Sequence, residues 1–229
     1  MGSGTDIDLY LENGRRVAEH IVSETEKAGR PIRELDTVLD FACGCGRVLH
    51  HLVKSGPRFA GCDVDRRAIT WLKEATPAEV IATGPSPPLP FDDESFDLIY
   101  TISSFTHFSE TDQDAWLREL ARLLRRGGIF IATTNGQSIL ERFQTEAALS
   151  AEHLARLADR NLGREGFVFE PYANSVASRG SHTNSAAVYG LAFHTQEYVR
   201  EHWGQVFSIR QIYTASTNSG QDLIVATAA

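Results

Sequence analysis

Apolar residues recur along this chain with two different spacings. From about Leu9 to Lys27 they stand three and four residues apart, as on one face of a helix, and Gly29 and Pro31 end that pattern. Short continuous apolar runs follow, mostly separated by segments that again have helical spacing. We expect these runs to be strands over residues 37–39, 59–62, 80–83, 96–103 and 129–134. Strands that alternate with helices predict a parallel sheet with helices on both faces.

One of the helices between these runs has recognisable ends. Ser109 is placed to cap its first turn, and Asp112 stands at the reciprocal third position. The apolar face continues to Leu124, and the glycine pair at 127–128 is expected to end the helix, because glycine readily adopts the left-handed conformation found there.

The pattern changes after residue 135. We expect an amphipathic helix from about Ser138 to Leu162, a glycine-, serine- and asparagine-rich loop around 174–185, and a helix over 196–202. Two strands, 206–213 and 222–227, would close the fold. A chain of 229 residues can bury one substantial core, so a single domain is predicted. Its parts are an N-terminal helical segment (1–35), a central core (36–135), a cap (136–195) and a closing helix and strand pair (196–229).

Charge and composition narrow the possible partners. The formal net charge is -8, and the sequence has no lysine- and arginine-rich face, which disfavours nucleic acid as a partner. The sequence shows no apolar run of about 20 residues and no secretory signal, so no membrane association and a cytoplasmic location are expected. Three cysteines do not make a disulfide framework. No metal is predicted either, because no second pair at zinc spacing completes Cys43 and Cys45.

The segment with the clearest chemistry is the loop from Asp40 to Gly46. It stands where a parallel strand passes into a helix, at the sheet edge where such folds bind ligands, and its glycines allow a ligand to approach the backbone closely. About twenty residues later, Asp63 ends the next strand and is placed to bind a ribose diol. Together they indicate a nucleoside cofactor. NAD, FAD and S-adenosylmethionine all fit this much, but the loop lacks the dinucleotide G-x-G-x-x-G pattern, and Arg47 opens the next helix.

An ordered set of motifs over about residues 35–135 resembles the class I S-adenosylmethionine-dependent methyltransferase family. The set comprises the run Val38–Gly46, then Asp63, then Leu89-Pro90-Phe91 with Ser95–Ile99, then Leu124–Gly128. The resemblance implies a Rossmann-like α/β fold with a seven-stranded, mostly parallel sheet whose last strand runs antiparallel, and a cap inserted after the fifth strand.

The same resemblance implies the cofactor contacts. It places the methionine portion of S-adenosylmethionine at the Asp40 loop, the ribose at Asp63, and the adenine near Val64 and the segment from Pro85 to Leu89. Ser103 would line the methyl donor. The loop residues implied are Asp40, Ala42, Gly44 and Gly46. The chain departs from the family twice. Ala42 replaces a usual glycine, which costs on the order of 1 kcal/mol if φ is positive there, and no aspartate near Pro85 can hold the adenine amino group.

Methyl transfer is an in-line displacement, so positioning dominates, and a base is needed only for an acceptor that must lose its proton. His107 is the candidate base, because it follows the fourth strand at the carboxyl edge, although it could instead pack the next helix. Phe105 is expected in the core. Substrate contacts are expected from His182, Tyr189 and His194, which lie in or after the loop of the cap.

Tyr10 and Arg15, on the first helix, could reach the methionine carboxylate or form a solvated face. The predicted function is methyl transfer to an oxygen or nitrogen of a small-molecule metabolite. A non-catalytic S-adenosylmethionine-binding protein and an NAD-type oxidoreductase are the alternatives. The sequence does not indicate an oligomeric state.

Overall fold

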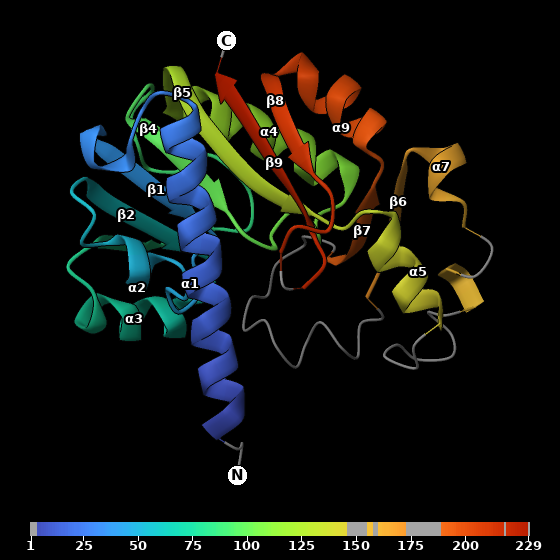
Figure 1. Ribbon diagram of the computed structural model, residues 1–229, viewed down its shortest axis with the longest axis horizontal. Helices are drawn as coiled ribbons and strands as arrows, with labels where there is room; N and C mark the ends of the chain where they lie inside the picture. Colours follow the sequence, from blue (N-terminus) through green and yellow to red (C-terminus); the bar gives the residue numbers. More distant parts are fainter. Residues whose placement is uncertain (1–3, 146–154, 158–159, 173–188, 218, 229) are drawn as a thin grey trace.

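The computed structural model describes residues 4–145, 155–157, 160–172, 189–217 and 219–228. Its centre is a twisted seven-stranded sheet with strand order β3-β2-β1-β4-β5-β9-β8 (Figure 1). The strands of this sheet are β1 (Thr37–Phe41), β2 (Arg58–Asp63), β3 (Glu79–Ala82), β4 (Phe96–Thr101), β5 (Leu124–Thr134), β8 (Phe207–Tyr213) and β9 (Asp222–Ala228). The helices are α1 (Gly4–Lys27), η1 (Ile32–Glu34), α2 (Leu49–Leu52), α3 (Arg66–Ala75), α4 (Glu110–Leu123), α5 (Gln137–Thr145), α7 (Leu162–Glu165), α9 (Gln196–His202) and η2 (Trp203–Gln205).

The strand directions confirm the predicted sheet. Strands β1 to β5 pair in parallel, whereas β9 runs antiparallel to both of its neighbours, β5 and β8. The strand order reverses between β1 and β4, so the carboxyl ends of β1, β2 and β4 border the crevice in which open α/β sheets bind ligands.

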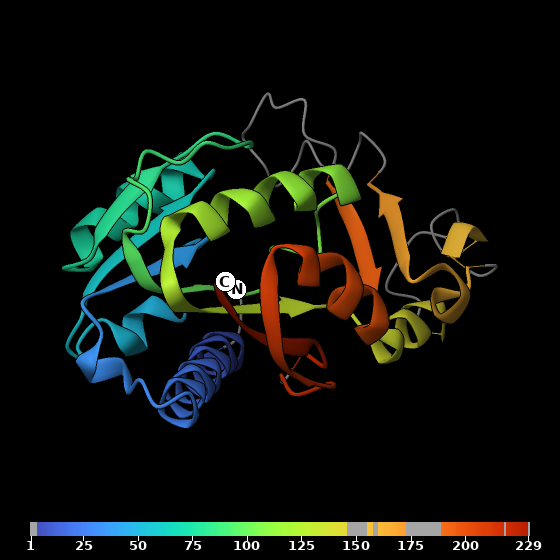
Figure 2. The same cartoon turned by 90° about the horizontal axis from the view of Figure 1, so that it is seen from above.

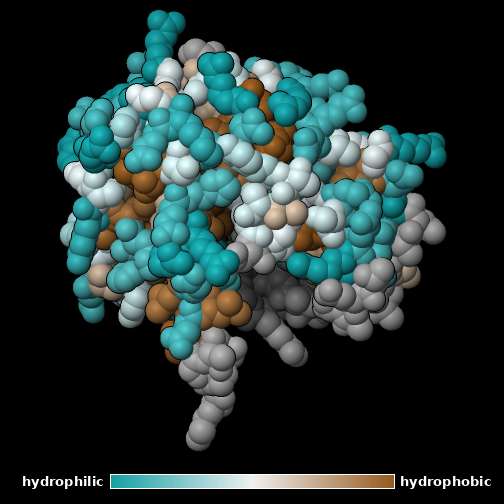
Figure 3. Space-filling view, in the orientation of Figure 1, coloured by the Kyte–Doolittle hydropathy of each residue, from teal (hydrophilic) through white to brown (hydrophobic). Residues whose placement is uncertain are grey.

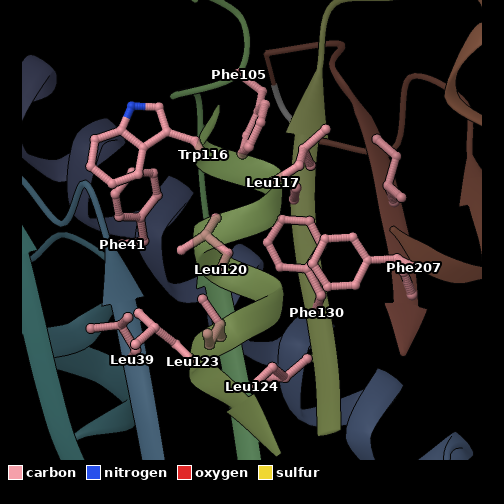
Figure 4. Packing of buried hydrophobic residues seen from close by; sticks show 14 of the residues in the cluster. Leu39, Phe41, Phe105, Trp116, Leu117, Leu120, Leu123, Leu124, Phe130 and Phe207 are labelled. Atoms are coloured by element: carbon pink, nitrogen blue, oxygen red, sulfur yellow. The ribbon is translucent and has the colours of Figure 1, made fainter. Parts of the chain in front are cut away.

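Two apolar layers hold helices against the two faces of the sheet (Figure 2). On one face α4 and α9 pack over the sheet, where Phe41 lies 4.7 Å from Trp116 and Phe130 lies 4.6 Å from Phe207, ring centre to ring centre (Figure 4). On the other face α1, α2 and α3 bury side chains such as Ile21. Aromatic pairs of this kind add to the stabilisation that comes from burial alone, so the core fixes how α4 crosses the sheet.

The predicted ends of α4 were right at one terminus and wrong at the other. Ser109 caps the first turn by accepting a hydrogen bond from the Asp112 backbone N–H, as expected. The helix ends at Leu123, not at the glycine pair 127–128, because Leu124 is extended, buried and paired with Phe96 of β4. Strand pairing therefore ends this helix earlier than its glycines would.

The cap differs most from its prediction. The helix expected from Ser138 to Leu162 is not continuous, because Asn161 caps the separate short helix α7 with its side chain. Two strands that were not predicted, β6 (Phe167–Pro171) and β7 (Gly190–His194), form a small antiparallel sheet. The loop predicted around 174–185 lies outside the described residues. The small sheet is joined to the end of β5, because the His194 N–H donates to the Asn135 carbonyl.

Candidate functional site

The loop after β1 has the conformation that its glycines suggested. Ala42 and Gly44 have φ of 60° and 53°, and a Cβ on Gly44 would have no atom within 4 Å, so this turn leaves open space beside the backbone. The positive φ of Ala42 means that the departure from the family pattern carries backbone strain of about 1 kcal/mol or more. The loop is therefore shaped for the close approach of another molecule rather than for packing within the chain.

Asp63 ties this loop to the end of β2. Its two carboxylate oxygens accept hydrogen bonds from the backbone N–H groups of Gly44, at 2.7 Å, and Asp65, at 2.8 Å. Each carboxylate oxygen can accept a further hydrogen bond. The side chain thus positions the loop and still has acceptor sites for the hydroxyl groups of a ligand.

A cavity of about 240 Å³ opens at the carboxyl ends of β1, β2 and β4. Six of the predicted site residues line it together: Ala42, Asp63, Val64, Ser103, His107 and Tyr189. Phe41, Phe108 and Trp116 form an aromatic part of its wall, and Thr83, Gly84 and Pro85 form another side. Leu89 does not line this cavity; it is buried in the core, and its backbone N–H donates to Glu119. An adenine contact at Leu89 is therefore not supported by its position.

A second cavity of about 240 Å³ adjoins the first, and Ala42 and Ile102 line both. The predicted residues Asp40 and Gly44 lie along it, whereas Gly46 lines neither cavity. Arg47 also lines it, with the guanidinium carbon 5.4 Å from the centre of the Tyr10 ring. No ligand contact was predicted for Arg47, although a basic residue directly after a glycine loop is a local signal for one.

The first helix contributes Tyr10 to this second cavity, and the Tyr10 hydroxyl lies 2.8 Å from the Cys45 sulfur. Arg15 does not reach the cavity, because its guanidinium pairs with Glu12 and Glu19 on the same helix.

The N-terminal end of α1 projects beyond the sheet, and apolar side chains gather there (Figures 1 and 3). They include Ile7, Leu9 and Leu11, all of them exposed.

Asp40 is fully enclosed at the base of this cavity. The Tyr100 hydroxyl donates a hydrogen bond of 2.9 Å to its carboxylate. Burial raises the pKa of Asp40 to about 8, outweighing the hydrogen bond from Tyr100, and the nearby Asp63 raises it further. A carboxyl group perturbed this strongly inside a cleft is typical of a functional site.

Ser103 is held in an unusual conformation beside the first cavity. Its φ is 66°, its backbone N–H donates to the Thr133 hydroxyl at 2.8 Å, and its own hydroxyl donates to the Gln221 side-chain carbonyl at 2.9 Å. These bonds from β5 and from the residue before β9 offset a conformation that a serine rarely adopts. This turn at Ser103 also explains why β4 ends at Thr101, two residues before its predicted end at Ser103.

His107 and Tyr189 lie on the wall of the first cavity, as their prediction requires. The Nδ1 atom of His107 lies 2.9 Å from the Gly190 carbonyl oxygen and 3.0 Å from the Tyr172 hydroxyl. Burial lowers the pKa of His107, against a smaller opposite effect of the Gly190 hydrogen bond. The imidazole is therefore neutral at neutral pH, which is the state that a general base requires.

The other two histidines predicted to contact substrate do not join this site. His194 is buried in the core, away from both cavities; its Nε2 lies 2.9 Å from the Gln113 side-chain oxygen, and burial lowers its pKa to about 3. Its position is that of a structural residue, because its ring bonds to Gln113 of α4 and packs against Tyr198 and Trp203. His182 lies outside the described residues. Phe105 is fully buried against Trp203 and Phe130, as expected.

Comparison with known proteins agrees with this geometry. Residues 39–132 match the family model described as a methyltransferase domain. The methyltransferase GfsG of Streptomyces halstedii is 32% identical over 132 residues, which cover 54% of this chain and 45% of that protein. Sarcosine/dimethylglycine N-methyltransferase of Halorhodospira halochloris is 26% identical over 195 residues, covering 76% and 69%. The chain spans about half the length of most of the curated relatives that it matches.

Solved structures share the fold at low sequence identity. An S-adenosylmethionine-dependent methyltransferase from Clostridium acetobutylicum has a TM-score of 0.63 and 11% identity, with 93% of this chain and 90% of that chain covered. Magnesium protoporphyrin IX methyltransferase from Synechocystis, solved with bound S-adenosylhomocysteine, has a TM-score of 0.61 and 14% identity, covering 100% and 90%.

The fold, the glycine loop and the matched domain are those of enzymes that bind a nucleoside cofactor. Residues 39–132 match the methyltransferase-domain family, and the chain has the fold of S-adenosylmethionine-dependent methyltransferases. Within the described residues, no helix has the length and apolar character needed to cross a membrane.

Proposed function

We propose that this protein transfers a methyl group from S-adenosylmethionine to an oxygen or nitrogen atom of a small molecule. The observation that carries the proposal is the pair of adjoining cavities that share Ala42 and Ile102 at the carboxyl edge of the sheet. The first cavity would hold the nucleoside of the cofactor and the second its amino-acid moiety, because the two cavities meet at Ala42 and Ile102.

The residues that line the two cavities fit the parts of S-adenosylmethionine. In the first cavity Asp63 has acceptor sites for a ribose diol, and Val64 and Pro85 offer an apolar wall for an adenine. In the second cavity Arg47 offers a guanidinium for the carboxylate of the methionine portion. The open space at Gly44 lets the cofactor approach the backbone between them. Asp40 and Ser103 each line one of the cavities and are proposed as cofactor contacts, whereas Leu89 lines neither cavity.

When it is bound, the sulfonium of S-adenosylmethionine supplies an electrophilic methyl group. The protein's part is to hold the acceptor in line with that group and to exclude water from it. In an acceptor that must lose a proton, Nε2 of the neutral His107 accepts it. Tyr189, on the same wall, contacts the acceptor.

Two observations support a small acceptor. The first cavity is only about 240 Å³, which is too small to hold a large acceptor in addition to the cofactor. The relative that aligns over 76% of the chain is named for methylating the nitrogen of sarcosine and dimethylglycine. We propose that the segment 136–195 selects the acceptor, since β6 and β7 stand beside the cavity. A cytoplasmic location and the absence of a nucleic-acid partner stay predictions from the composition.

Calorimetric titration with S-adenosylmethionine, S-adenosylhomocysteine and NAD tests the cofactor assignment. We expect the first two to bind with micromolar affinity and NAD not to bind. Asp63→Ala should weaken binding at least tenfold, because it removes the ribose acceptor and the tether of the Gly44 loop. Asp92→Ala, which removes an exposed carboxylate far from both cavities, should leave affinity unchanged.

The titration and a screen of acceptors also decide between the alternatives. Binding of NAD, or of none of the three compounds, would exclude a methyltransferase. Binding of S-adenosylmethionine with no methyl transfer to any amine or hydroxyl acceptor would favour a non-catalytic binding protein. If transfer is found, His107→Ala should lower it by about 10²-fold for an acceptor that must lose its proton.

A further inference from the structure

His107 is held from two sides by the small β6–β7 sheet. Its ring nitrogen Nδ1 lies 2.9 Å from the Gly190 carbonyl oxygen, at the first residue of β7, and 3.0 Å from the Tyr172 hydroxyl, directly after β6. The imidazole and phenol ring centres are 6.0 Å apart. Two groups from separate segments of the cap, Tyr172 after β6 and Gly190 in β7, therefore meet at one nitrogen of the candidate base.

The Gly190 carbonyl determines which nitrogen carries the proton. A carbonyl oxygen can only accept a hydrogen bond, so Nδ1 must be the protonated nitrogen of the neutral ring. The Tyr172 oxygen lies close enough to accept part of the same hydrogen bond. The other nitrogen, Nε2, is left with its lone pair and can accept a proton from a substrate.

Backbone hydrogen bonds also join β7 to the segment that carries His107. The Gly190 N–H donates to the His107 carbonyl at 3.0 Å, and the Ala192 N–H donates to the Thr106 carbonyl at 2.8 Å. Tyr189 forms an antiparallel bridge with Phe108. The Tyr172 N–H in turn donates to the Tyr189 carbonyl at 2.9 Å. Residues 106–108 thus extend the small sheet, and the backbone of His107 is fixed relative to the groups that bind its ring.

Gly190 can make this approach only without a side chain. A Cβ at this position would lie 2.3 Å from the Glu170 carbonyl oxygen and 2.7 Å from the Phe169 ring. These atoms belong to β6, which pairs with β7 through Pro171 and Gly190. Any side chain at 190 would therefore push β7, and with it the carbonyl that His107 binds, out of place.

From this arrangement we propose that Tyr172 and Gly190 are positioning residues that fix His107 as its Nδ1–H tautomer, with Nε2 as the proton acceptor. The proposal rests on the proposed function, because it assigns the two residues a role in the same proton transfer. In this proposal the β6–β7 sheet has a role besides contacting the acceptor, because it determines which ring nitrogen of His107 is protonated.

The tautomer can be measured without any substrate, by nitrogen NMR of the full chain with ¹⁵N-labelled histidine. His107→Gln identifies the signals of His107. We expect Nδ1 of the wild-type ring to be protonated at pH 7.5 and Nε2 to be unprotonated. A ring protonated mainly at Nε2, or a nearly equal mixture, would overturn the proposal.

Variants test the two partners separately. Tyr172→Phe removes only the hydroxyl and should shift the His107 population measurably toward the Nε2–H tautomer. Gly190→Ala should shift it further, and if that variant does not fold, Tyr172→Phe still decides the matter. Tyr189→Phe is the matched control for the tautomer measurement alone, because Tyr189 lines the same cavity but Nδ1 of His107 bonds to Gly190 and Tyr172 instead. If Tyr172→Phe leaves the tautomer unchanged, Tyr172 has no positioning role.

Titration of the same variants with S-adenosylhomocysteine separates this proposal from the proposed function. We expect Tyr172→Phe to bind it as the wild type does, since the hydroxyl contacts the base and not the cofactor loop. For a methylated acceptor that must lose its proton, kcat should fall roughly tenfold in Tyr172→Phe while KM for S-adenosylmethionine stays constant. If the wild type does not bind S-adenosylhomocysteine, the proposed function is overturned, but the tautomer of His107 can still be measured.

Discussion

Asp40 shows how a single residue in the site can oppose the stability of the fold. Its carboxyl group is enclosed beside Tyr100, and burial raises its pKa to about 8. Ala42 and Ser103, in the same region, both have positive φ. Groups held in unfavourable states are common where a protein binds ligands, and the rest of the fold must offset them.

This raised pKa predicts an unusual pH dependence of stability. The carboxyl group of an unfolded chain ionises near pH 3.9, whereas that of folded Asp40 retains its proton up to about 8. The unfolded state therefore binds fewer protons over this window, so Asp40 lowers the free energy of unfolding as the pH rises from 4 to 8. Asp40→Asn cannot ionise and should be more stable than the wild type at pH 8, by about 2 kcal/mol or more.

Urea unfolding at pH 5 and at pH 8 measures the effect. The difference in stability between variant and wild type should grow with pH, and Asp92→Asn, at an exposed position, should show no such growth. Equal differences at both pH values would mean that folded Asp40 ionises normally.

Among the elements, several are joined by one polar side chain, that of Asp97 at the start of β4. Its carboxylate binds Arg30 at 2.9 Å and Arg125 at 2.6 Å, and it accepts hydrogen bonds from the backbone N–H groups of Asp36 and Thr37. One buried side chain thereby joins the segment after α1 to β1, β4 and β5. Removing it leaves several donors without their partner, which is among the more destabilising changes a protein can undergo.

The Asp97 connection makes a prediction with the opposite sign in pH. Burial alone would raise the pKa of Asp97, but the hydrogen bonds from Thr37, Arg125 and Asp36 outweigh it and lower the pKa. The stabilisation by Asp97 is then present above pH 4 and is lost as the pH falls through the lowered pKa. Asp97→Asn should lower the free energy of unfolding by roughly 3 kcal/mol at pH 7, and by less below pH 4.

Asp36→Asn provides the comparison, because the Asp36 carboxylate is exposed and lies 3.6 Å from the same Arg125. Chemical denaturation should show a change below 1 kcal/mol for this variant. A similarly small change in Asp97→Asn would show that the buried connection contributes little.

The elements also show where sequence patterns succeed. Buried parallel strands such as 96–101 are mostly apolar runs, and four of the five were placed within two residues of their observed ends. The exception is β5, which begins at Leu124, five residues before its predicted start. The Asp40 loop, Asp63 and His107 were located because each stands at the carboxyl end of such a strand or within a few residues after it. The small sheet was missed because Phe167–Pro171 and Gly190–His194 are short and pair across a long connection.

The roles of Tyr172 and Gln221 depend on contacts between distant segments, which no local pattern contains. His194 illustrates the reverse error. A histidine near a binding loop suggests a ligand contact, but the register of β7 turns its side chain into the core.

At the scale of the whole molecule, the cofactor should act as a stabilising ligand. The two cavities are built from the ends of β1, β2 and β4 together with α1, so a molecule that fills them connects elements distant in the sequence. Binding at 100 times Kd adds about 2.7 kcal/mol to the stability of the folded state. For a chain of this size, that corresponds to a rise in Tm of about 5–10 °C.

Thermal unfolding followed by fluorescence checks this expectation. S-adenosylhomocysteine should raise Tm of the wild type, and the same concentration should raise it far less in Asp63→Ala. NAD is the control ligand and should leave Tm unchanged. A rise of equal size in the variant would place the binding site elsewhere on the molecule.

The position of β9 has a consequence for how the protein is made. This strand, Asp222–Ala228, lies between β5 and β8, so β8 leaves the ribosome before the strand that pairs it to the sheet has been synthesised. Gln221, which holds Ser103, directly precedes β9. During translation, β5 therefore keeps an unpaired edge until β9 arrives, and the hydrogen bond that supports Ser103 in the cavity wall forms only then. A nascent chain stalled before residue 221 would be the form most exposed to chaperones and aggregation.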